Sequence, residues 1–296
     1  MILKIFVISS GGILCYSKNF FDEIMMKEEI FGGFLSAISG FAREIKGGQI
    51  KTLSFRNFNL FYSYSNEFDY IFVVVADKDD LEREVRPKVE LMKSEFIGRY
   101  GLYLKEWAGN CSIFDDFDEF VEKKIIIPPK ILLMGVKGVG KKTIMDLFPG
   151  EVFLDIDEDL NEITQKLIKL SDLKDIQQCI IKKIDMEELA YNAIRYKILL
   201  NSVDVIIIIT NSSYSNLRKT KVLYSRIKPR VPKADFYLIA NFQDEEDTAF
   251  EPEKIEETLN LKTYGFSAIK GDSNKKILFI INEMLRNSVK KKFEVG

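Results

Sequence analysis

Histidine is absent from all 296 residues of the chain. This absence excludes histidine acid-base catalysis, histidine metal ligation and a Ser-His-Asp triad. Cysteine is also scarce, with only Cys15, Cys111 and Cys179 in the chain. Because these three are odd in number and far apart, we predict neither a disulfide framework nor a cysteine zinc site. We therefore expect a cytoplasmic protein whose chemistry uses other side chains.

Long apolar runs are missing as well. The longest, residues 203–210, is interrupted by Asp204 and is far shorter than the ~20 residues of a membrane span. The start of the chain, residues 1–4, is not followed by the long apolar run of a secretory signal. We expect no transmembrane segment and at most peripheral contact with a membrane.

Neither sign of charge dominates, since 43 basic residues stand against 45 acidic ones and the net charge is −2. This balance argues against general nucleic-acid binding. With 46% hydrophobic and 30% charged residues, the composition is that of a globular protein, and the length allows two domains with separate cores.

A pair of prolines divides two patterns of predicted secondary structure. Pro128 and Pro129 stiffen the chain and remove two backbone donors, so we place a domain boundary there, between residues 1–127 and residues 128–296.

The first domain is predicted as an α+β domain with the order β-β-α-β-β-β-α-α. Apolar, β-branched runs around turn residues indicate strands, and apolar residues at i, i+3, i+4 and i+7 indicate helices. We expect Pro87 to kink or divide the second helix. The predicted strands are 2–8, 13–17, 49–55, 57–63 and 70–76, and the predicted helices are 31–45, 77–100 and 113–121.

The second domain alternates strands with helices, which is typical of an α/β domain with a mostly parallel sheet. The predicted strands are 130–134, 179–184, 205–210, 236–240 and 263–267, and the predicted helices are 141–147, 189–200, 216–227, 252–259 and 274–289.

A phosphate-binding loop is predicted between the first strand and the first helix of this domain. The spacing is Gly-x-x-x-x-Gly-Lys, in which glycines let backbone N–H groups converge on an anion while the lysine reaches the outer phosphates. The candidate nucleotide-binding residues of this loop are Gly135, Gly138, Val139, Gly140, Lys141, Lys142 and Thr143.

Lys142 departs from the usual pattern, which has serine or threonine at that position. A hydroxyl there coordinates Mg²⁺, whereas an ammonium has no lone pair to offer a metal. Thr143 is no simple replacement, because one step along a helix turns a side chain by about 100°. The sequence therefore puts Mg²⁺ binding in doubt.

With these motifs, the segment from Lys130 onward resembles a small Ras-like GTPase domain of the Ras, Rab and Arf superfamily. The resemblance implies that GTP or GDP is bound. In that family, an aspartate at the end of the third strand and a glycine three residues later hold water-bound Mg²⁺ and the γ-phosphate. Here Asp185 is present, but Glu188 replaces the glycine and Leu189 stands where a glutamine often orients water. We therefore expect GTP hydrolysis to be slow or absent.

Two further motifs resemble the base-reading loops of that family. Residues 241–244, Asn-Phe-Gln-Asp, are similar to Asn-Lys-x-Asp, and Ser267 with Ala268 is similar to the Ser-Ala-Lys loop. A carboxylate at Asp244 accepts the two adjacent N–H groups of guanine, which adenine lacks. The resemblance therefore implies that Asn241, Asp244, Ser267 and Ala268 bind guanine.

The place of the first switch is occupied by residues 151–171, and that of the second by residues 185–196. Thr164 is a candidate contact for the γ-phosphate and the metal, together with Asp185, although a surface or capping threonine fits the sequence equally well. We interpret the acidic run that includes Asp155, Asp157, Glu158 and Asp159 as a solvated face rather than a metal cluster.

The element order of the first domain resembles a longin domain, a profilin-like module of trafficking proteins, and a roadblock domain is the nearest alternative. Both modules commonly partner small GTPases, so the resemblance implies protein partners bound through this domain and the switch segments. We expect a guanine-nucleotide switch or adaptor in vesicle traffic or cell polarity. The alternative is a pseudo-GTPase scaffold that does not cycle nucleotide. An ATP-using kinase or ATPase is disfavoured, because the base-reading motifs would then have no role.

Overall fold

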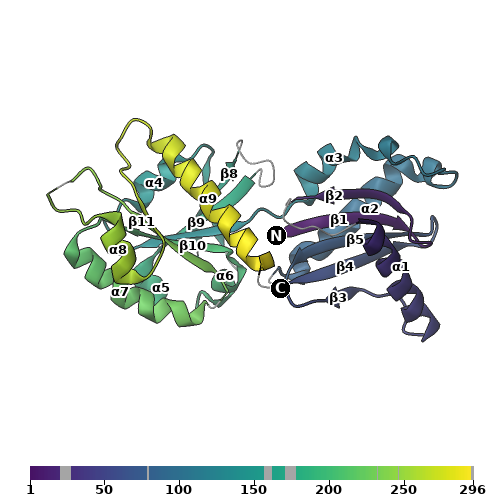
Figure 1. Ribbon diagram of the computed structural model, residues 1–296, viewed down its shortest axis with the longest axis horizontal. Helices are drawn as coiled ribbons and strands as arrows, with labels where there is room; N and C mark the ends of the chain where they lie inside the picture. The colour runs from purple at the N-terminus through teal and green to yellow at the C-terminus, as the bar shows by residue number, and fades with distance from the viewer. Residues whose placement is uncertain are drawn as a thin grey trace. The chain divides into compact units, whose positions relative to one another are not determined.

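The computed structural model describes residues 1–20, 28–78, 80–156, 162–170, 178–231, 233–245 and 247–294. It divides at the proline pair into two compact units, Met1–Pro128 and Pro129–Lys292. Each unit has its own sheet (Figure 1).

The first unit is built on a five-stranded antiparallel sheet with the order β2-β1-β5-β4-β3. Its element order begins as the sequence predicts. The elements are β1 (Ile2–Ser9), β2 (Leu14–Asn19), α1 (Glu28–Glu44), β3 (Thr52–Ser54), β4 (Phe58–Ser65), β5 (Tyr70–Asp77), α2 (Glu82–Leu104), η1 (Cys111–Phe114), α3 (Phe117–Phe120) and η2 (Val121–Ile125). The last three replace the single helix predicted over residues 113–121.

Helices α1 and α2 cover opposite faces of this sheet. Phe6 of β1 stacks on Phe31 of α1, with ring centroids 4.8 Å apart. Tyr16, which lies opposite Val7 in the β1–β2 register, packs against Phe96 of α2. Since successive strand residues point to opposite faces, the two aromatic contacts belong to two separate layers of core.

Of the two expected effects of Pro87, a kink or a division of the second helix, the division is wrong. Helix α2 is continuous from Glu82 to Leu104, with Pro87 inside it. Proline removes only one backbone donor, and the fully buried side chains of Val85 and Val89 lie on either side of it. Burial of this apolar face therefore outweighs the local cost of the proline.

The second unit is built on a seven-stranded sheet with the order β12-β11-β10-β6-β9-β8-β7. Five strands run parallel, as predicted: β6 (Lys130–Gly135), β9 (Gln178–Asp185), β10 (Val205–Thr210), β11 (Asp235–Ala240) and β12 (Thr263–Gly265). The helices are α4 (Lys141–Leu147), α5 (Met186–Tyr191), α6 (Lys197–Ser202), α7 (Tyr214–Ile227), η3 (Lys228–Arg230), α8 (Pro252–Leu259) and α9 (Ser273–Glu294). In Figure 1, α4 and α9 lie on one side of the sheet, and α5, α6, α7 and α8 lie on the other.

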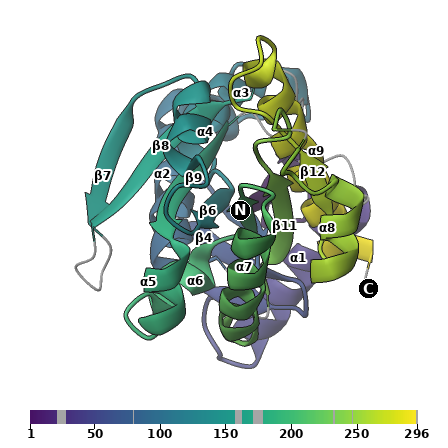
Figure 2. The same ribbon diagram turned by 90° about the vertical axis from the view of Figure 1, so that its left-hand side faces the viewer.

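Two antiparallel strands complete the sheet. They lie in residues 151–171, the segment predicted to occupy the place of the first switch. They are β7 (Val152–Ile156) and β8 (Glu162–Lys169), which form the end of the sheet beyond β9 (Figure 2). Strand β7 exposes large apolar side chains, among them Leu154 at 66% and Ile156 at 63%. The described part of the first switch is therefore a pair of strands.

The helix predicted over residues 189–200 is two helices, α5 and α6, separated by a turn. The backbone leaves helical geometry at Asn192, where φ is −119°. Asparagine commonly ends helices, because its side chain competes for backbone hydrogen bonds.

Among the described residues, no helix is both long and apolar enough to cross a membrane.

Candidate nucleotide site

The loop predicted to bind phosphate, called the phosphate loop below, connects the end of β6 to the start of α4, and its glycines are required by geometry. A Cβ atom on Gly135 would lie 2.6 Å from the carbonyl oxygen of Ile209, so no larger residue fits there. Gly138 and Gly140 have φ values of 88° and 90°, in the left-handed region that side chains rarely adopt. The backbone of this loop is thus shaped as an anion cradle requires.

Lys141 is the first residue of α4, and its ammonium group folds back over the loop. It donates hydrogen bonds to the carbonyl oxygens of Gly135 and Val136, the second at 2.8 Å, and to Oδ2 of Asp185 at 3.2 Å. An ammonium group has three N–H donors, so these contacts engage all of them. Burial lowers the pKa of Lys141, against the opposing effect of the Asp185 carboxylate.

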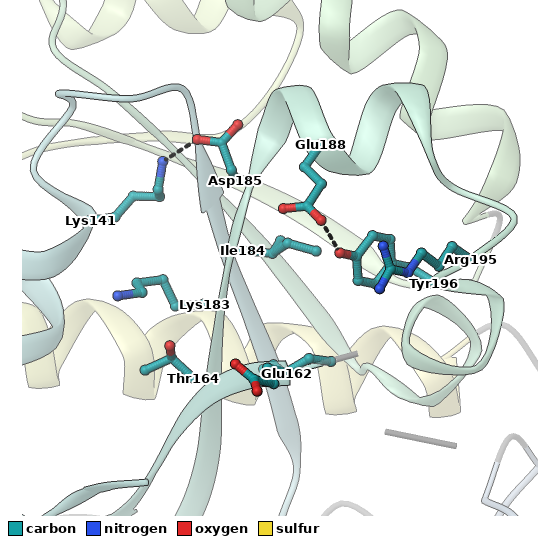
Figure 3. Close-up of a pocket in the computed structure, with 10 residues that line it drawn as sticks. Lys141, Glu162, Thr164, Lys183, Ile184, Asp185, Glu188, Arg195 and Tyr196 are labelled. Carbon is teal, nitrogen blue, oxygen red and sulfur yellow. Dashed lines mark hydrogen bonds and ion pairs between the residues drawn. The ribbon is translucent and has the colours of Figure 1, made fainter. Parts of the chain in front are cut away.

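Asp185 ends β9 and serves as the N-cap of α5. Its Oδ1 accepts a hydrogen bond of 2.9 Å from the backbone N–H of Glu187, while its Oδ2 accepts from Lys141 (Figure 3). Both carboxylate oxygens are therefore engaged, one by the helix and one by the phosphate-loop lysine.

A cavity of about 540 Å³ lies beside this ion pair. Thr164 of β8 lines it and stands directly opposite Lys183 of β9 in the strand register. The structure thus brings Thr164 to the same cavity as Lys141 and Asp185. The lining residues are Lys141, Glu162, Ile163, Thr164, Lys183, Ile184, Asp185, Glu188, Arg195 and Tyr196.

The residues at this site do not fit the Mg²⁺ ion that the Ras-like resemblance implies. Magnesium prefers oxygen ligands in an octahedral arrangement. Lys142 offers no oxygen, its side chain and that of Thr143 are exposed, and Asp185 is held by Lys141. Within the described ranges, no three Cys, Asp or Glu side chains gather as a metal site.

The predicted base-reading loop is joined to the phosphate loop by Asn241, which follows β11. The side chain of Asn241 is only 1% exposed. Its Nδ2 donates to the carbonyl oxygen of Val139 at 3.1 Å, and its Oδ1 accepts from the backbone N–H of Ala268 at 3.3 Å. One amide therefore connects three predicted site segments at the carboxyl edge of the parallel sheet, where ligands bind in open α/β folds.

Phe242 adopts a backbone conformation that bulky residues rarely show, with φ at 64°. Its neighbour Gln243 holds the turn, because its Nε2 donates to Ser212 Oγ at 2.9 Å and to the carbonyl oxygen of Phe250 at 3.0 Å. The sequence did not predict Ser212 or this role of Gln243. The turn residues after β10 are the only sequence signal that pointed to them.

Asp244 lies half-buried after this turn. The nearby Ser267 hydroxyl holds the pKa of the Asp244 carboxyl below its usual value, and the positive charge of Lys270 acts in the same direction. The carboxylate is therefore ionised at neutral pH, as an acceptor for two N–H donors must be.

Some positions singled out in the sequence are not among the residues that the structure describes. The acidic residues Asp157, Glu158 and Asp159 lie outside the described residues, as do residue 171 of the first switch and the side chain of Asp155. Lys183 lies at the cavity, although the sequence analysis did not select it.

No protein-family model and no curated protein matches the chain. Solved structures similar to it include a mutant NFeoB protein of S. thermophilus bound to GDP, with 16% identity, a TM-score of 0.41 and coverage of 53% of this chain and 62% of that one. The cytosolic domain of the T. maritima FeoB iron transporter in its GMPPNP form has 16% identity, a TM-score of 0.41 and coverage of 54% and 64%. Its apo form has 14% identity, a TM-score of 0.43 and coverage of 55% and 64%. The chain thus spans less than two thirds of these proteins, and similarity at this level assigns neither a family nor a ligand.

Proposed function

We propose that the unit Pro129–Lys292 binds a guanine nucleotide, GTP or GDP. The observation that carries this proposal is the buried amide of Asn241, which bonds both to Val139 of the phosphate loop and to Ala268. A surface loop rich in glycine would have no need of this connection. Two segments that would hold the two ends of one nucleotide are fixed relative to each other before the ligand arrives, which lowers the ordering cost of binding.

In this proposal the phosphates lie on the backbone N–H groups around Gly138 and Gly140, at the start of α4. Lys141 donates to the outer phosphates, in exchange for one of its present contacts. Asp244 accepts from the two adjacent N–H groups of guanine, which gives preference for guanine over adenine.

We further propose that GTP hydrolysis is slow or absent. Phosphoryl transfer depends on a metal ion and on a group that orients water. Lys142 cannot ligate a metal, and Leu189 is fully buried and carries no polar group for a water molecule. The nearby Glu188 is already hydrogen-bonded to the hydroxyl of Tyr196.

As a function in the cell, we propose a switch or adaptor that contacts protein partners through the first unit and through segments 151–171 and 185–196. The support is the element order of the first unit, on which the longin resemblance rests. A place in vesicle traffic or cell polarity is part of the same proposal.

A second candidate is a scaffold that does not cycle nucleotide. It is favoured by Lys141, whose three donors are satisfied by the protein itself. A loop with its cation neutralised is stable without phosphate.

The test is identification of any nucleotide released on denaturation, followed by calorimetric titration of GTP, GDP and ATP. We expect GTP and GDP to bind below millimolar concentration and ATP to bind more weakly, with little GDP formed from GTP in the same samples. Asp244→Ala should abolish the preference for guanine, and Asp247→Ala, a nearby exposed carboxylate, should preserve it. Absence of binding below millimolar would favour the scaffold.

A further inference from the structure

Lys183 lies beside the phosphate-loop lysine and has no role in the function described so far. It lies on β9 two residues before Asp185, so both side chains leave the strand on the same face. Lys183 is half-buried and lines the same cavity as Lys141 and Thr164. Figure 3 shows the side chains of Lys183 and Lys141 on the same side of the close-up, to the left of Ile184.

No described residue neutralises Lys183 by a hydrogen bond or an ion pair. None of the carboxylates that line the cavity forms an ion pair with Lys183. Asp185 pairs with Lys141, Glu188 accepts from a tyrosine hydroxyl, and Glu162 is exposed at the end of β8. A half-buried ammonium with no partner among the described residues is an unusual feature, because lysine is seldom withdrawn from water without a partner.

The two lysines act on each other. Burial is the main cause that lowers the pKa of Lys141, and the positive charge of Lys183 lowers it further. Two like charges at one partly buried site repel each other until an anion lies between them. The cavity thus presents two ammonium groups to an anion, that of Lys141, which is paired with Asp185, and that of Lys183, which has no partner among the described residues.

We propose that Lys183 is a second phosphate-binding cation and that, together with Lys141, it neutralises the outer phosphates of the nucleotide without a divalent metal. The proposal rests on the proposed function, because it assumes a nucleoside di- or triphosphate in the phosphate loop. It accounts for the misfit with Mg²⁺: the loop has lost the hydroxyl ligand at Lys142, and β9 supplies a fixed positive charge at the same cavity.

The test is calorimetric titration of the full-length chain with GTP and with GMP, each in Mg²⁺ and in EDTA. The wild type should bind GTP equally well in both buffers. Lys183→Met should weaken GTP binding by about tenfold or more, the usual effect of losing a charge-assisted hydrogen bond. GMP, which lacks the outer phosphates, should bind Lys183→Met and the wild type alike. Lys183→Arg, which keeps the charge, should retain most of the GTP affinity.

Lys182→Met is the matched control, since it removes the same group from the neighbouring position on the opposite face of β9, and it should bind GTP as the wild type does. Lys183→Gln repeats the test with a polar side chain, and circular dichroism of each variant verifies folding. Binding that EDTA abolishes, or equal GTP affinity in Lys183→Met and the wild type, would overturn the role of Lys183 while leaving the proposed function standing. Failure of the wild type to bind any guanine nucleotide would overturn both.

Discussion

Asn241 and Asp244 are three residues apart, yet the structure gives them different tasks. The amide of Asn241 is buried and bonds to Val139 and Ala268, whereas the carboxylate of Asp244 is half-buried and ionised. The first side chain holds the loops together, and the second is available to a ligand.

We therefore predict that Asn241→Ala lowers the free energy of unfolding by about 1–3 kcal/mol, because the carbonyl of Val139 and the N–H of Ala268 both lose a buried partner. Asp244→Ala should lower it by less than Asn241→Ala does, because the Asp244 side chain is partly exposed and connects no two loops. Urea denaturation of both variants measures the difference. Equal stability of Asn241→Ala and the wild type would contradict the bridging role.

At this scale the sequence predicted the residues whose position follows from motif spacing, such as Gly140, Lys141 and Asp244. It could not predict Lys183, because a lysine in a strand reads as a solvated residue until the register with Thr164 and the direction of Lys141 are known. Those relations depend on contacts between segments far apart in the chain.

Among the elements, β8 is fastened to the helix that opens at the phosphate loop. Lys166 of β8 is 4% exposed, and its ammonium donates to the carbonyl oxygens of Met145 at 3.2 Å and Phe148 at 2.5 Å. These carbonyls lie at the carboxyl end of α4, where a cation complements the helix dipole. The strand that carries Thr164 is thereby joined to the far end of the helix that carries Lys141.

We predict that Lys166→Met lowers the free energy of unfolding by about 1–3 kcal/mol, because the two carbonyls lose their donor in a buried place. Lys169→Met, which changes an exposed lysine of the same strand, is the control and should have little effect. Chemical denaturation followed by circular dichroism measures both. Equal losses in the two variants would mean that the hydrogen bonds from Lys166 to Met145 and Phe148 add nothing to the free energy of unfolding.

The parallel strands were predictable because a strand buried on both faces reads as a continuous apolar run, as β10 does. Strand β8 gives no such signal, since its buried positions include Lys166 and Gln165. The local rule that proline breaks helices predicted a division at Pro87, but burial of Val85 and Val89 outweighed the cost of the proline.

At the scale of the whole molecule, the two units can be followed separately. The single tryptophan, Trp107, belongs to the first unit, where its ring lies 6.0 Å from that of Phe114 and its Nε1 donates to the carbonyl of Asn110. Its fluorescence therefore reports on the unit that lacks the candidate nucleotide site.

We predict that GTP at about one hundred times its dissociation constant stabilises the second unit by about 2.7 kcal/mol. Thermal unfolding followed by circular dichroism should show this as a transition moved to higher temperature. The transition reported by Trp107 emission should stay in place. A tryptophan transition that moves together with the other would show that the two units unfold as one.

The two contacts of Asp185 couple the candidate nucleotide site to helix α5. Its two oxygens connect Lys141 to the first turn of α5. In the proposed complex, a phosphate that draws Lys141 away would leave Asp185 with the backbone N–H of Glu187 as its remaining described contact. If the proposed nucleotide binds, its arrival would exchange one anion for another on the Lys141 ammonium, and the carboxylate exchanged is the one that caps α5.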